Sequence, residues 1–385
     1  MSPSSTTDAI EHVYDFTSDT ATIPTDEMFD IMKMASRGDD VFAADKNVNE
    51  LEAFMADLLG QEAALFCASG TMTNQLGLRT LLTQPPHSVL CDARAHIFVH
   101  ECGGLSYHSQ ASVTPVMPKN GKYLTVEDVK ANIVTDTLCG APTRVVALEN
   151  TLNGTLMPIE EIKRIREYCN ANGLYLHLDG ARLWNASAAT GVSMKEYGQL
   201  FDTISVCLSK GAGAPIGSIV ASTTDRIRHA RHLRKLLGGG WRQAGFLALA
   251  ARHCIDTVVP RLAETHQLAA KLARHLQDLG VHLALPCETN MLFIDLAPVN
   301  LTVEQLANAL SEKRIKITKS AGTVTRVVLH YQITPEAVQD FMDVAAELIS
   351  KSKVSSTGSG SIKQTETFTQ STPDLGNAYP SMQSY

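Results

Sequence analysis

Lys210 follows an apolar stretch, residues 203–208, and precedes a loop of mostly small residues, 211–217. A lysine buried at such a place must be paired or neutral, because an isolated ammonium is costly away from water. Burial lowers the pKa of lysine side chains in general, and a neutral amine can form a Schiff base with a carbonyl compound. The loop glycines let a ligand approach the backbone closely. Lys210 is therefore the candidate for covalent binding of pyridoxal 5'-phosphate (PLP), and a surface lysine at a strand end is the alternative.

Asp179 ends another apolar stretch, in the segment LHLDGARLWNA. A buried carboxylate needs a cationic partner, and the protonated pyridine nitrogen of PLP is such a partner. That pairing makes the ring an electron sink for a carbanion. Arg182, one helical turn later, could bind a substrate carboxylate through its planar guanidinium. An internal ion pair between Asp179 and Arg182 explains the same two residues equally well.

Ser69, Gly70 and Thr71 lie between a predicted strand and a predicted helix. The free N–H groups of a first helical turn favour a phosphate group. Gly70 removes steric hindrance and Thr71 adds a hydroxyl, so this turn is a candidate phosphate site. An ordinary helix cap is the alternative.

Three further residues have a chemical and a structural interpretation. His96, just after a predicted strand, could stack on a cofactor ring or act as a base, or it could be a structural histidine. Arg242 follows a triple glycine and could reach a phosphate across a dimer interface, or it could be a loop arginine. Arg326 lies on a predicted strand near the C-terminus and could hold a carboxylate, or it could be a solvent-facing charge.

The elements that must position these residues alternate along the chain. Their order predicts the α/β class with a largely parallel sheet, followed by a small α+β domain. A long helical stretch with a kink at Pro260 joins the two. Strands are predicted at residues 63–68, 88–91, 112–116, 144–148, 174–178, 203–208, 218–221, 291–294 and 324–329, and helices include 50–59, 159–172, 303–314 and 335–350. The predicted parts are a flexible N-terminus (1–13), a large PLP-binding domain (14–255), a small domain (256–350) and a disordered low-complexity tail (351–385).

The composition excludes several classes of protein. The chain has 385 residues, of which 44% are hydrophobic and 19% charged, so it can bury a large core. A net charge of -7 gives no basic surface for nucleic acid. The eight cysteines form no CxxC pair and indicate reduced thiols. Without a signal peptide or an apolar run of spanning length, we expect a cytoplasmic protein that does not bind membranes.

The order of the candidate residues is more specific than any one of them. A phosphate turn, His96, Asp179, Lys210 and a C-terminal arginine follow one another as in PLP enzymes of fold type I. Over residues 14–350 the chain resembles the L-threonine aldolases in their fungal form, a family that also includes fungal alanine racemases. The matching segments are DFTSDTATIPT, EAALFCASGTMTNQ, CDARAHIFVHE, GAPTRVVALENTLNG, HLDGARLWNA, CLSKGAGAPIGS, GGGWRQAG and VLHYQIT.

The resemblance implies a fold, a cofactor and a reaction. The fold is a large domain with a mostly parallel seven-stranded sheet and a small C-terminal α+β domain. The reaction is retro-aldol cleavage of L-threonine or L-allo-threonine to glycine and an aldehyde through a carbanion, by a homotetramer built as a dimer of dimers. PLP is the only cofactor and no metal is expected. The implied cofactor ligands are Lys210, Asp179, His96, Gly70, Thr71, Arg182 and Arg242 of the partner subunit, and the implied substrate ligands are Ser18, Arg182 and Arg326.

Five positions depart from the family pattern. Phe42 and Ala43 stand where Tyr and Gly are usual, and Trp241 replaces a smaller apolar residue. Leu152 stands where bacterial members often have His, and Ala212 replaces Leu or Met. If Phe42 and Trp241 face the substrate, the pocket is less polar and favours a substrate without a β-hydroxyl. Aldol cleavage is the expected activity and alanine racemisation is the alternative.

A third hypothesis is a non-catalytic scaffold that has kept the fold. The presence of Lys210, Asp179 and Arg182 together argues against it.

Overall fold

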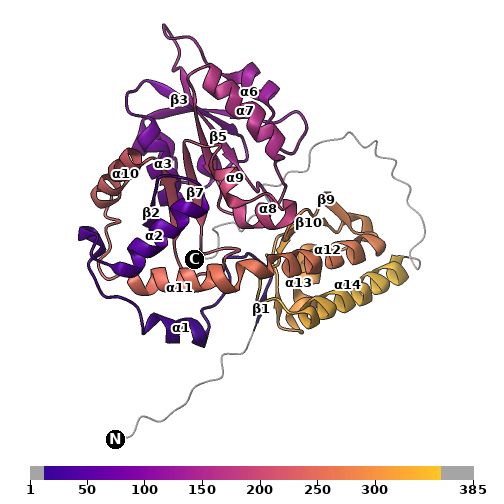
Figure 1. Cartoon of the computed structure of the whole chain (residues 1–385). Coiled ribbons are helices and arrows are strands. Elements are labelled where there is room, and N and C mark those ends of the chain that lie inside the picture. Colours follow the sequence, from indigo (N-terminus) through magenta and orange to yellow (C-terminus); the bar gives the residue numbers. More distant parts are fainter. Residues whose placement is uncertain (1–12, 357–385) are drawn as a thin grey trace, which may run out of the picture. The chain divides into compact units, whose positions relative to one another are not determined.

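A computed structural model describes residues 13–356 (Figure 1). The chain forms two compact units: Thr22–His266, and a second unit that combines Met1–Ala21 with Gln267–Tyr385. The predicted domains began at residue 14 and divided at 255. The difference at residues 14–21 arises because this segment pairs with a strand close to residue 315. The N-terminal segment 1–12 and the predicted tail from residue 357 lie outside the described residues.

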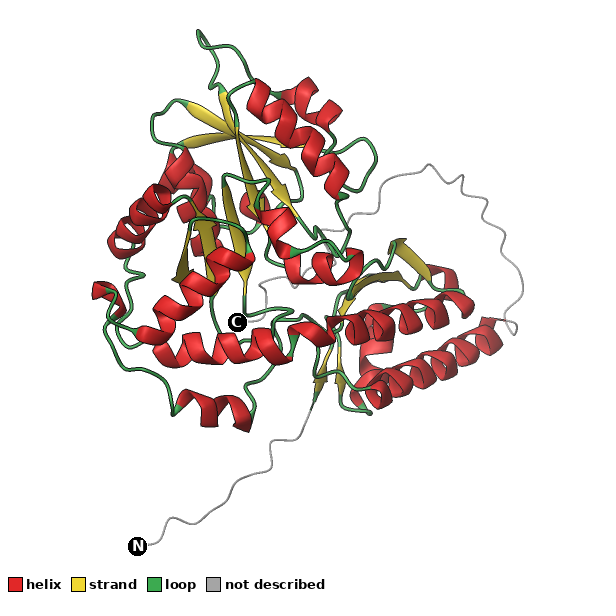
Figure 2. Ribbon diagram, in the orientation of Figure 1, coloured by secondary structure: helices red, strands yellow, loops and turns green. Residues whose placement is uncertain are grey.

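The first unit is built on a seven-stranded sheet in the order β2-β8-β7-β6-β5-β3-β4. Strands β3 to β7 run parallel, and β8 is antiparallel to both β7 and β2 (Figure 2). The predicted mostly parallel seven-stranded sheet is confirmed. The strands are β2 (Ala63–Cys67), β3 (His87–Asp92), β4 (Ala111–Val116), β5 (Thr143–Glu149), β6 (Tyr175–Asp179), β7 (Thr203–Cys207) and β8 (Ser218–Ser222).

Helices cover both faces of this sheet, which explains why its central strands are almost entirely buried. Figure 1 shows α3 and α10 on one side of the sheet and α6 and α7 on the other. The helices of this unit are α1 (Asp26–Met32), η1 (Asp40–Phe42), α2 (Lys46–Leu58), α3 (Gly70–Leu81), α4 (His96–Val99), α5 (Gly104–Ser109), α6 (Val126–Asn132), α7 (Ile159–Ala171), α8 (Leu183–Thr190), α9 (Met194–Gly198), α10 (Thr224–Leu236), α11 (Gly245–Thr257) and η2 (Val259–Arg261).

The second unit holds two small sheets and its own core. β1 (Tyr14–Asp15) pairs with β11 (Ile315–Lys316), and β10 (Met291–Asp295) lies between β9 (His282–Leu285) and β12 (Val324–Val328). The aromatic ring of Phe16 packs 5.6 Å from that of Phe341 in this core. Its helices are α12 (Leu262–Asp278), which begins before the border of the unit, η3 (Ala297–Val299), α13 (Val303–Ser311) and α14 (Pro335–Ser356).

Several predicted helix limits differ from the structure: α2 begins at Lys46 and not at residue 50, and α13 ends at Ser311 and not at residue 314. The long helical stretch predicted to join the domains is interrupted around Pro260, at the predicted kink, as expected for a residue that cannot donate a helical hydrogen bond. The last helix continues to Ser356, so the first six residues of the predicted tail are helical. No helix within residues 13–356 is both long enough and apolar enough to span a membrane.

Candidate active site

The candidate residues of the first unit gather at one edge of its sheet. β5, β6 and β7 are parallel neighbours, so their carboxyl ends lie side by side, and Glu149 pairs with Asp179 across two of them. Cys67 and Cys207 both pair with Ser218 of β8, so the carboxyl end of β2 lies at the same edge. Ligands of open α/β sheets bind at this edge. The residues it brings together are Ser69–Thr71 after β2, His96 after β3, Glu149 at the end of β5, Asp179 at the end of β6 and Lys210 after β7.

Lys210 lies in a tight turn that directly follows β7. Its carbonyl accepts a hydrogen bond from the N–H of Gly213 at 2.8 Å, and the carbonyl of Leu208 accepts one from Ala214 at 2.9 Å. The side chain is half-buried. No residue in the part of the chain that the structure describes binds the ammonium directly, although its charge acts on Glu149. An amine in this position is available to a carbonyl ligand.

Asp179 is buried, with 2% of its surface exposed. Its Oδ1 accepts a hydrogen bond from the N–H of Ala181 at 3.0 Å, and its Oδ2 accepts one from Nδ2 of Asn74 at 2.7 Å. These two donors fix the plane of the carboxylate. Arg182 is half-buried and is the residue from which α8 starts, so it stays beside this edge of the sheet.

His96 is held from two sides. Its Nδ1 lies 2.8 Å from Oε1 of Glu101, and its backbone N–H donates to Oε2 of Glu149 at 2.8 Å. Burial alone would lower the pKa of His96, but the hydrogen bond to Glu101 and the charge of Asp179 outweigh burial and raise it. The ring is therefore more easily protonated than that of a free histidine, and its other nitrogen, Nε2, is left for a ligand.

Glu149 is a half-buried residue at the same edge. Burial and the neighbouring charge of Asp179 raise the pKa of Glu149, and the N–H of His96 opposes this only in part. The neutral acid is thus favoured well above the pH at which a free glutamate ionises. It can then support the backbone of His96 without adding a further negative charge to those of Asp179 and Glu101.

His96, Glu101 and Asp179 also place their nitrogen and oxygen atoms within 4.8 Å of one another. Such a group can in principle hold a metal ion. Here hydrogen bonds explain the arrangement, because His96 binds Glu101 and Asn74 donates to both carboxylates.

The turn before α3 has the geometry of an anion-binding site, and its backbone packs closely against Cys207. Ser69 caps the helix, and its hydroxyl accepts from the N–H of Met72 at 3.2 Å. A Cβ atom at Gly70 would lie 2.7 Å from Sγ of Cys207, which leaves room for glycine only. Thr71 follows in the first turn of α3 and is half-buried. The free N–H groups here favour a phosphate.

Replacement of Gly70 by alanine is expected to destabilise the protein by about 1–3 kcal/mol, because the new methyl group overlaps Cys207. Thermal unfolding of the apoprotein measures this. The double variant Gly70→Ala/Cys207→Ala removes the sulfur and should recover most of the loss. A double variant as unstable as the single one would show that the overlap with Cys207 is not the cause.

These groups together fit PLP. The cofactor needs an amine for its aldehyde, a carboxylate for its pyridine nitrogen and N–H groups for its phosphate. Lys210 can supply the first and Asp179 the second, and the turn at residues 69–71 can supply the third. The absence of a side chain at Gly70 lets the backbone of this turn pack closely against Cys207 at the carboxyl end of β7.

Two predicted substrate ligands lie together in the second unit. Arg326 is on β12, with 8% of its surface exposed, and its Nη2 donates to the carbonyl of Thr17 at 3.1 Å. Ser18 follows Thr17 directly and is half-buried. The hydroxyl of Ser18 accepts from the N–H of Thr20 at 3.2 Å. The structure therefore brings these two residues together although more than 300 positions separate them in the sequence.

The remaining predicted residues lie on two joined loops of the first unit. Nη1 of Arg242 binds Oδ2 of Asp39 at 2.8 Å, and the carbonyl of Arg242 accepts from the N–H of Asp40. Phe42 is 76% exposed, whereas the ring of Trp241 packs against another aromatic ring, that of Phe66, at 4.9 Å.

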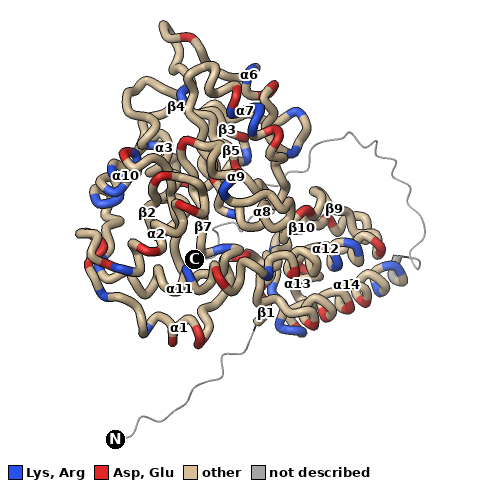
Figure 3. The backbone as a smooth tube through the Cα atoms, in the orientation of Figure 1, with Lys and Arg blue, Asp and Glu red and all other residues tan. Residues whose placement is uncertain are grey.

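A buried ion pair anchors these loops to α10, whose arginines and lysine are blue in Figure 3. Nη2 of Arg234 lies 2.6 Å from Oδ2 of Asp40, and both side chains are almost completely buried. Loss of Asp40 would leave the buried guanidinium of Arg234 without its carboxylate, which is strongly destabilising, whereas Asp40 itself also lies 3.6 Å from Nη1 of Arg231.

The sequence did not single out four polar residues that the structure places at the site: Asn74, Glu101, Glu149 and His177. For two of these residues the sequence contains a feature that could have identified them. Glu149 directly follows the predicted strand 144–148, as Asp179 follows the predicted strand 174–178, and Glu101 follows His96 by little more than one helical turn. Asn74 and His177 lie inside elements that read as ordinary core.

A family model described as beta-eliminating lyase matches residues 15–298. The chain is similar to a low-specificity L-threonine aldolase of Candida albicans, with 46% identity over 330 residues, 85% of this chain and 87% of that protein. It is similar at a lower level to the alanine racemase TOXG of Cochliobolus carbonum, with 35% identity over 344 residues and 87% of each chain.

Solved structures agree in fold. A threonine aldolase of Leishmania major superposes with a TM-score of 0.76 at 22% identity, over 87% of this chain and 99% of that one. A structure of SPT with PLP superposes with a TM-score of 0.68 at 18% identity, over 89% of each chain. The predicted architecture of fold type I is confirmed.

Proposed function

This chain belongs to the beta-eliminating lyase family, and from that we propose that it cleaves L-threonine and L-allo-threonine to glycine and an aldehyde. It is a PLP-dependent lyase. The observation that carries the proposal is the meeting of Lys210, Asp179 and His96 at one sheet edge, in a chain 46% identical to a low-specificity L-threonine aldolase.

The chain supplies binding, orientation and charge. When bound, PLP withdraws electrons from the α-carbon of the amino acid, as cleavage next to that carbon requires. Lys210 provides the amine for covalent attachment, and Asp179 places a negative charge opposite the pyridine nitrogen. The N–H groups of residues 69–71 hold the phosphate, with Arg242 of the partner subunit as a further proposed ligand.

Three residues are proposed to bind the substrate carboxylate. Arg182 offers a planar guanidinium that can bind both oxygens at once. Ser18 and Arg326 are proposed for the same role. Phe42 and Trp241 are proposed to contact the side chain of the substrate.

His96 is proposed to stack on the cofactor ring and to accept the proton of the β-hydroxyl group. Its Nδ1 is engaged by Glu101, so the proton must pass to Nε2. A histidine can accept a proton only in its neutral form. Because Glu101 raises the pKa of His96, activity should increase as the pH rises through that pKa.

The variant Glu101→Gln should shift the acidic limb of the pH profile of kcat/KM to lower pH by about one unit, because a neutral amide no longer favours the protonated ring. Steady-state rates with L-threonine across the pH range measure this shift. Glu336→Gln, an exposed position, is the control and should leave the profile unchanged. An unshifted profile in Glu101→Gln would exclude His96 as the group that titrates.

The first test of the function is glycine release from L-threonine by the purified, PLP-loaded protein. We expect release well above a control without enzyme, and also with L-allo-threonine. Protein that binds PLP but releases no glycine from either substrate would contradict the aldolase assignment. Failure to bind PLP at all would contradict the cofactor assignment.

Alanine racemisation is the second candidate. It starts from the same bound amino acid but breaks the bond from the α-carbon to hydrogen, so the same residues could support it. The similarity of 35% to an alanine racemase favours it less than the 46% to an aldolase. Incubation with L-alanine followed by chiral analysis distinguishes the two activities. We expect D-alanine to form much more slowly than glycine is released from L-threonine.

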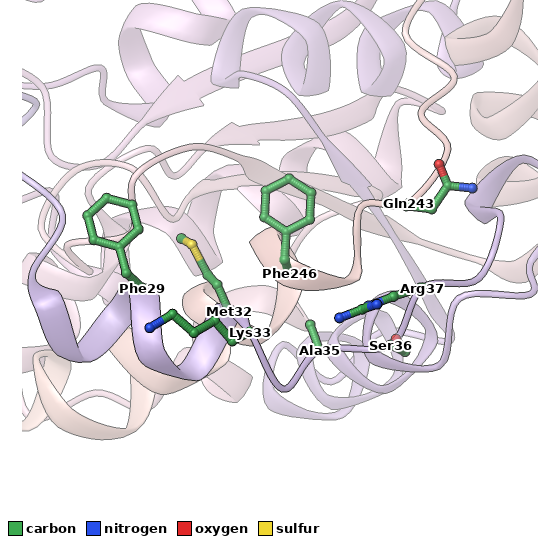
Figure 4. Close-up of a pocket in the computed structure, with 8 residues that line it drawn as sticks. All are labelled: Phe29, Met32, Lys33, Ala35, Ser36, Arg37, Gln243 and Phe246. Carbon is green, nitrogen blue, oxygen red and sulfur yellow. The ribbon is translucent and has the colours of Figure 1, made fainter. Parts of the chain in front are cut away.

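We propose that the protein works as a homotetramer, a dimer of dimers, in the cytoplasm. Large apolar side chains that lie exposed support an oligomer, since such surface is typical of interfaces. Met34 is 83% exposed. Phe29 of α1 and Phe246 of α11 line a pocket of about 490 Å³, and Figure 4 shows both side chains. Sedimentation of the purified protein tests this, and a monomer in an active preparation would contradict it.

A further inference from the structure

A buried polar layer lies between α3 and the sheet, directly behind Asp179. Side chains alternate along β6, so His177 and Asp179 point to the same face, and β7 continues that face through the paired residues Thr203 and Ser205. From the other side α3 contributes three consecutive polar residues. All of these side chains are at least 95% buried: Thr73, Asn74, Gln75, His177, Asp179, Thr203 and Ser205.

The hydrogen bonds of His177 define which ring nitrogen carries its proton. Burial lowers the pKa of His177 to about 4, so the ring is neutral near pH 7. Nε2 lies 3.2 Å from Oδ1 of Asn74, and Nδ1 lies 2.8 Å from Oγ1 of Thr203. An amide oxygen can only accept, so the proton is on Nε2, and the hydroxyl of Thr203 donates to Nδ1.

This arrangement also fixes the side-chain amide of Asn74. With its oxygen turned to His177, its Nδ2 points at two carboxylates: Glu101 at 2.8 Å and Asp179 at 2.7 Å. The opposite orientation would place the amide oxygen against both carboxylates, and oxygen atoms of either kind can only accept hydrogen bonds. The two carboxylates come within 4.8 Å of each other, so a donor shared between them offsets their repulsion.

We propose that Thr203, His177 and Asn74 form a hydrogen-bond relay that holds the carboxylate of Asp179 in place for the pyridine nitrogen of PLP. The three residues are positioning residues, because they act on the cofactor only through Asp179. The proposal rests on the proposed function in one respect, the pairing of Asp179 with the cofactor.

The packing of α3 against the ring of His177 supports the relay. Gly77 lies one turn after Asn74, and a Cβ atom there would come within 3.3 Å of Cε1 of His177. A larger residue would press against the ring and move it relative to Asn74. The small size of Gly77 thus lets the imidazole of His177 pack against α3 within hydrogen-bonding distance of the Asn74 amide.

The test is the dissociation constant of PLP, measured by adding cofactor to apoprotein and following its visible absorbance. Asn74→Leu keeps the shape of the side chain but removes both donors, and we expect PLP to bind at least roughly tenfold more weakly. His177→Phe keeps the ring but removes the donor to Asn74, and we expect a weakening of roughly threefold to tenfold. His177→Gln retains an N–H at the distal position and should bind PLP within about twofold of the wild type.

Ser205→Ala is the matched control. Its hydroxyl lies 2.6 Å from that of Thr73 in the same buried layer but does not contact the relay. It should lower the thermal midpoint and leave PLP binding unchanged. If Asn74→Leu does not fold, the comparison of His177→Phe with His177→Gln still decides.

Two outcomes would overturn the proposal. One is unchanged PLP affinity in both Asn74→Leu and His177→Phe, with only a lower thermal midpoint, which would make the layer purely structural. The other is an equal loss of affinity in Ser205→Ala. Neither can be confused with failure of the proposed function, in which the wild-type protein itself would not bind PLP or would bind it without cleaving L-threonine.

Discussion

Replacement of Lys210 by alanine is expected to reduce glycine release from L-threonine by at least about 10³-fold, because it removes the nucleophilic amine at the site. Among residues 13–356, Lys210 is the lysine that lies in the tight turn after β7, at the carboxyl edge of the sheet. The variant should also lose covalent attachment. Reduction with borohydride followed by mass spectrometry should show the cofactor's added mass on the wild-type protein only.

Lys235→Ala is the matched control for this experiment. It removes a lysine on the same unit, at the end of α10, and should retain both the added mass and the activity. Full activity of Lys210→Ala would refute the central assignment of the site. Circular dichroism would show whether the variant lost activity because it failed to fold. We do not expect misfolding, because the half-buried ammonium of Lys210 binds no residue directly within residues 13–356.

Asp179→Asn is expected to lower kcat/KM by roughly 10²- to 10³-fold, because an amide has the same shape but no charge to place opposite the pyridine nitrogen. PLP should also bind more weakly. The loss should exceed that of any relay variant, since the relay acts only through this carboxylate. Cofactor titration and steady-state kinetics on the same preparation measure both effects.

Asp202→Asn separates the loss of a site charge from the loss of any partly buried aspartate. Asp202 lies outside the site and pairs with Nη1 of Arg166 at 2.7 Å. Its replacement should cost stability without changing the affinity for PLP. A wild-type rate in Asp179→Asn would mean that the buried carboxylate at the end of β6 does not face the cofactor.

Much of the first unit could be predicted from the sequence because its signals are local. An apolar run bounded by turn residues marks each strand, and the strand limits agree with the structure to within one or two residues. Parallel strands that alternate with helices then place their carboxyl ends at one edge. The positions of Lys210, Asp179 and His96 at that edge follow from this pattern alone.

The residues that complete the site could not be predicted in this way, since they depend on contacts between distant segments. Asn74 reaches Asp179 across 105 positions, and nothing in the spacing of α3 marks its amide as more than a core polar group. The parallel pairing of Tyr14 with Ile315 likewise involves strands of only two residues, too short to give a periodic signal. The same holds for His177, which reads as an interior residue of a buried strand.

The pairing of β1 with β11 has a consequence for how the protein is made. Residues 14–16 leave the ribosome early, whereas β11, the strand with which Tyr14 and Asp15 pair, ends at Lys316. Phe16 therefore cannot enter the core of the second unit until most of the chain has emerged. Residues 22–266, in contrast, form a continuous stretch whose internal partners are all available earlier. We therefore expect the first unit to fold during translation while the N-terminal segment stays unpaired. The second unit then closes only on a completed polypeptide, so a nascent chain cut short before residue 315 would expose the apolar side chain of Phe16 to the quality-control machinery of the cell.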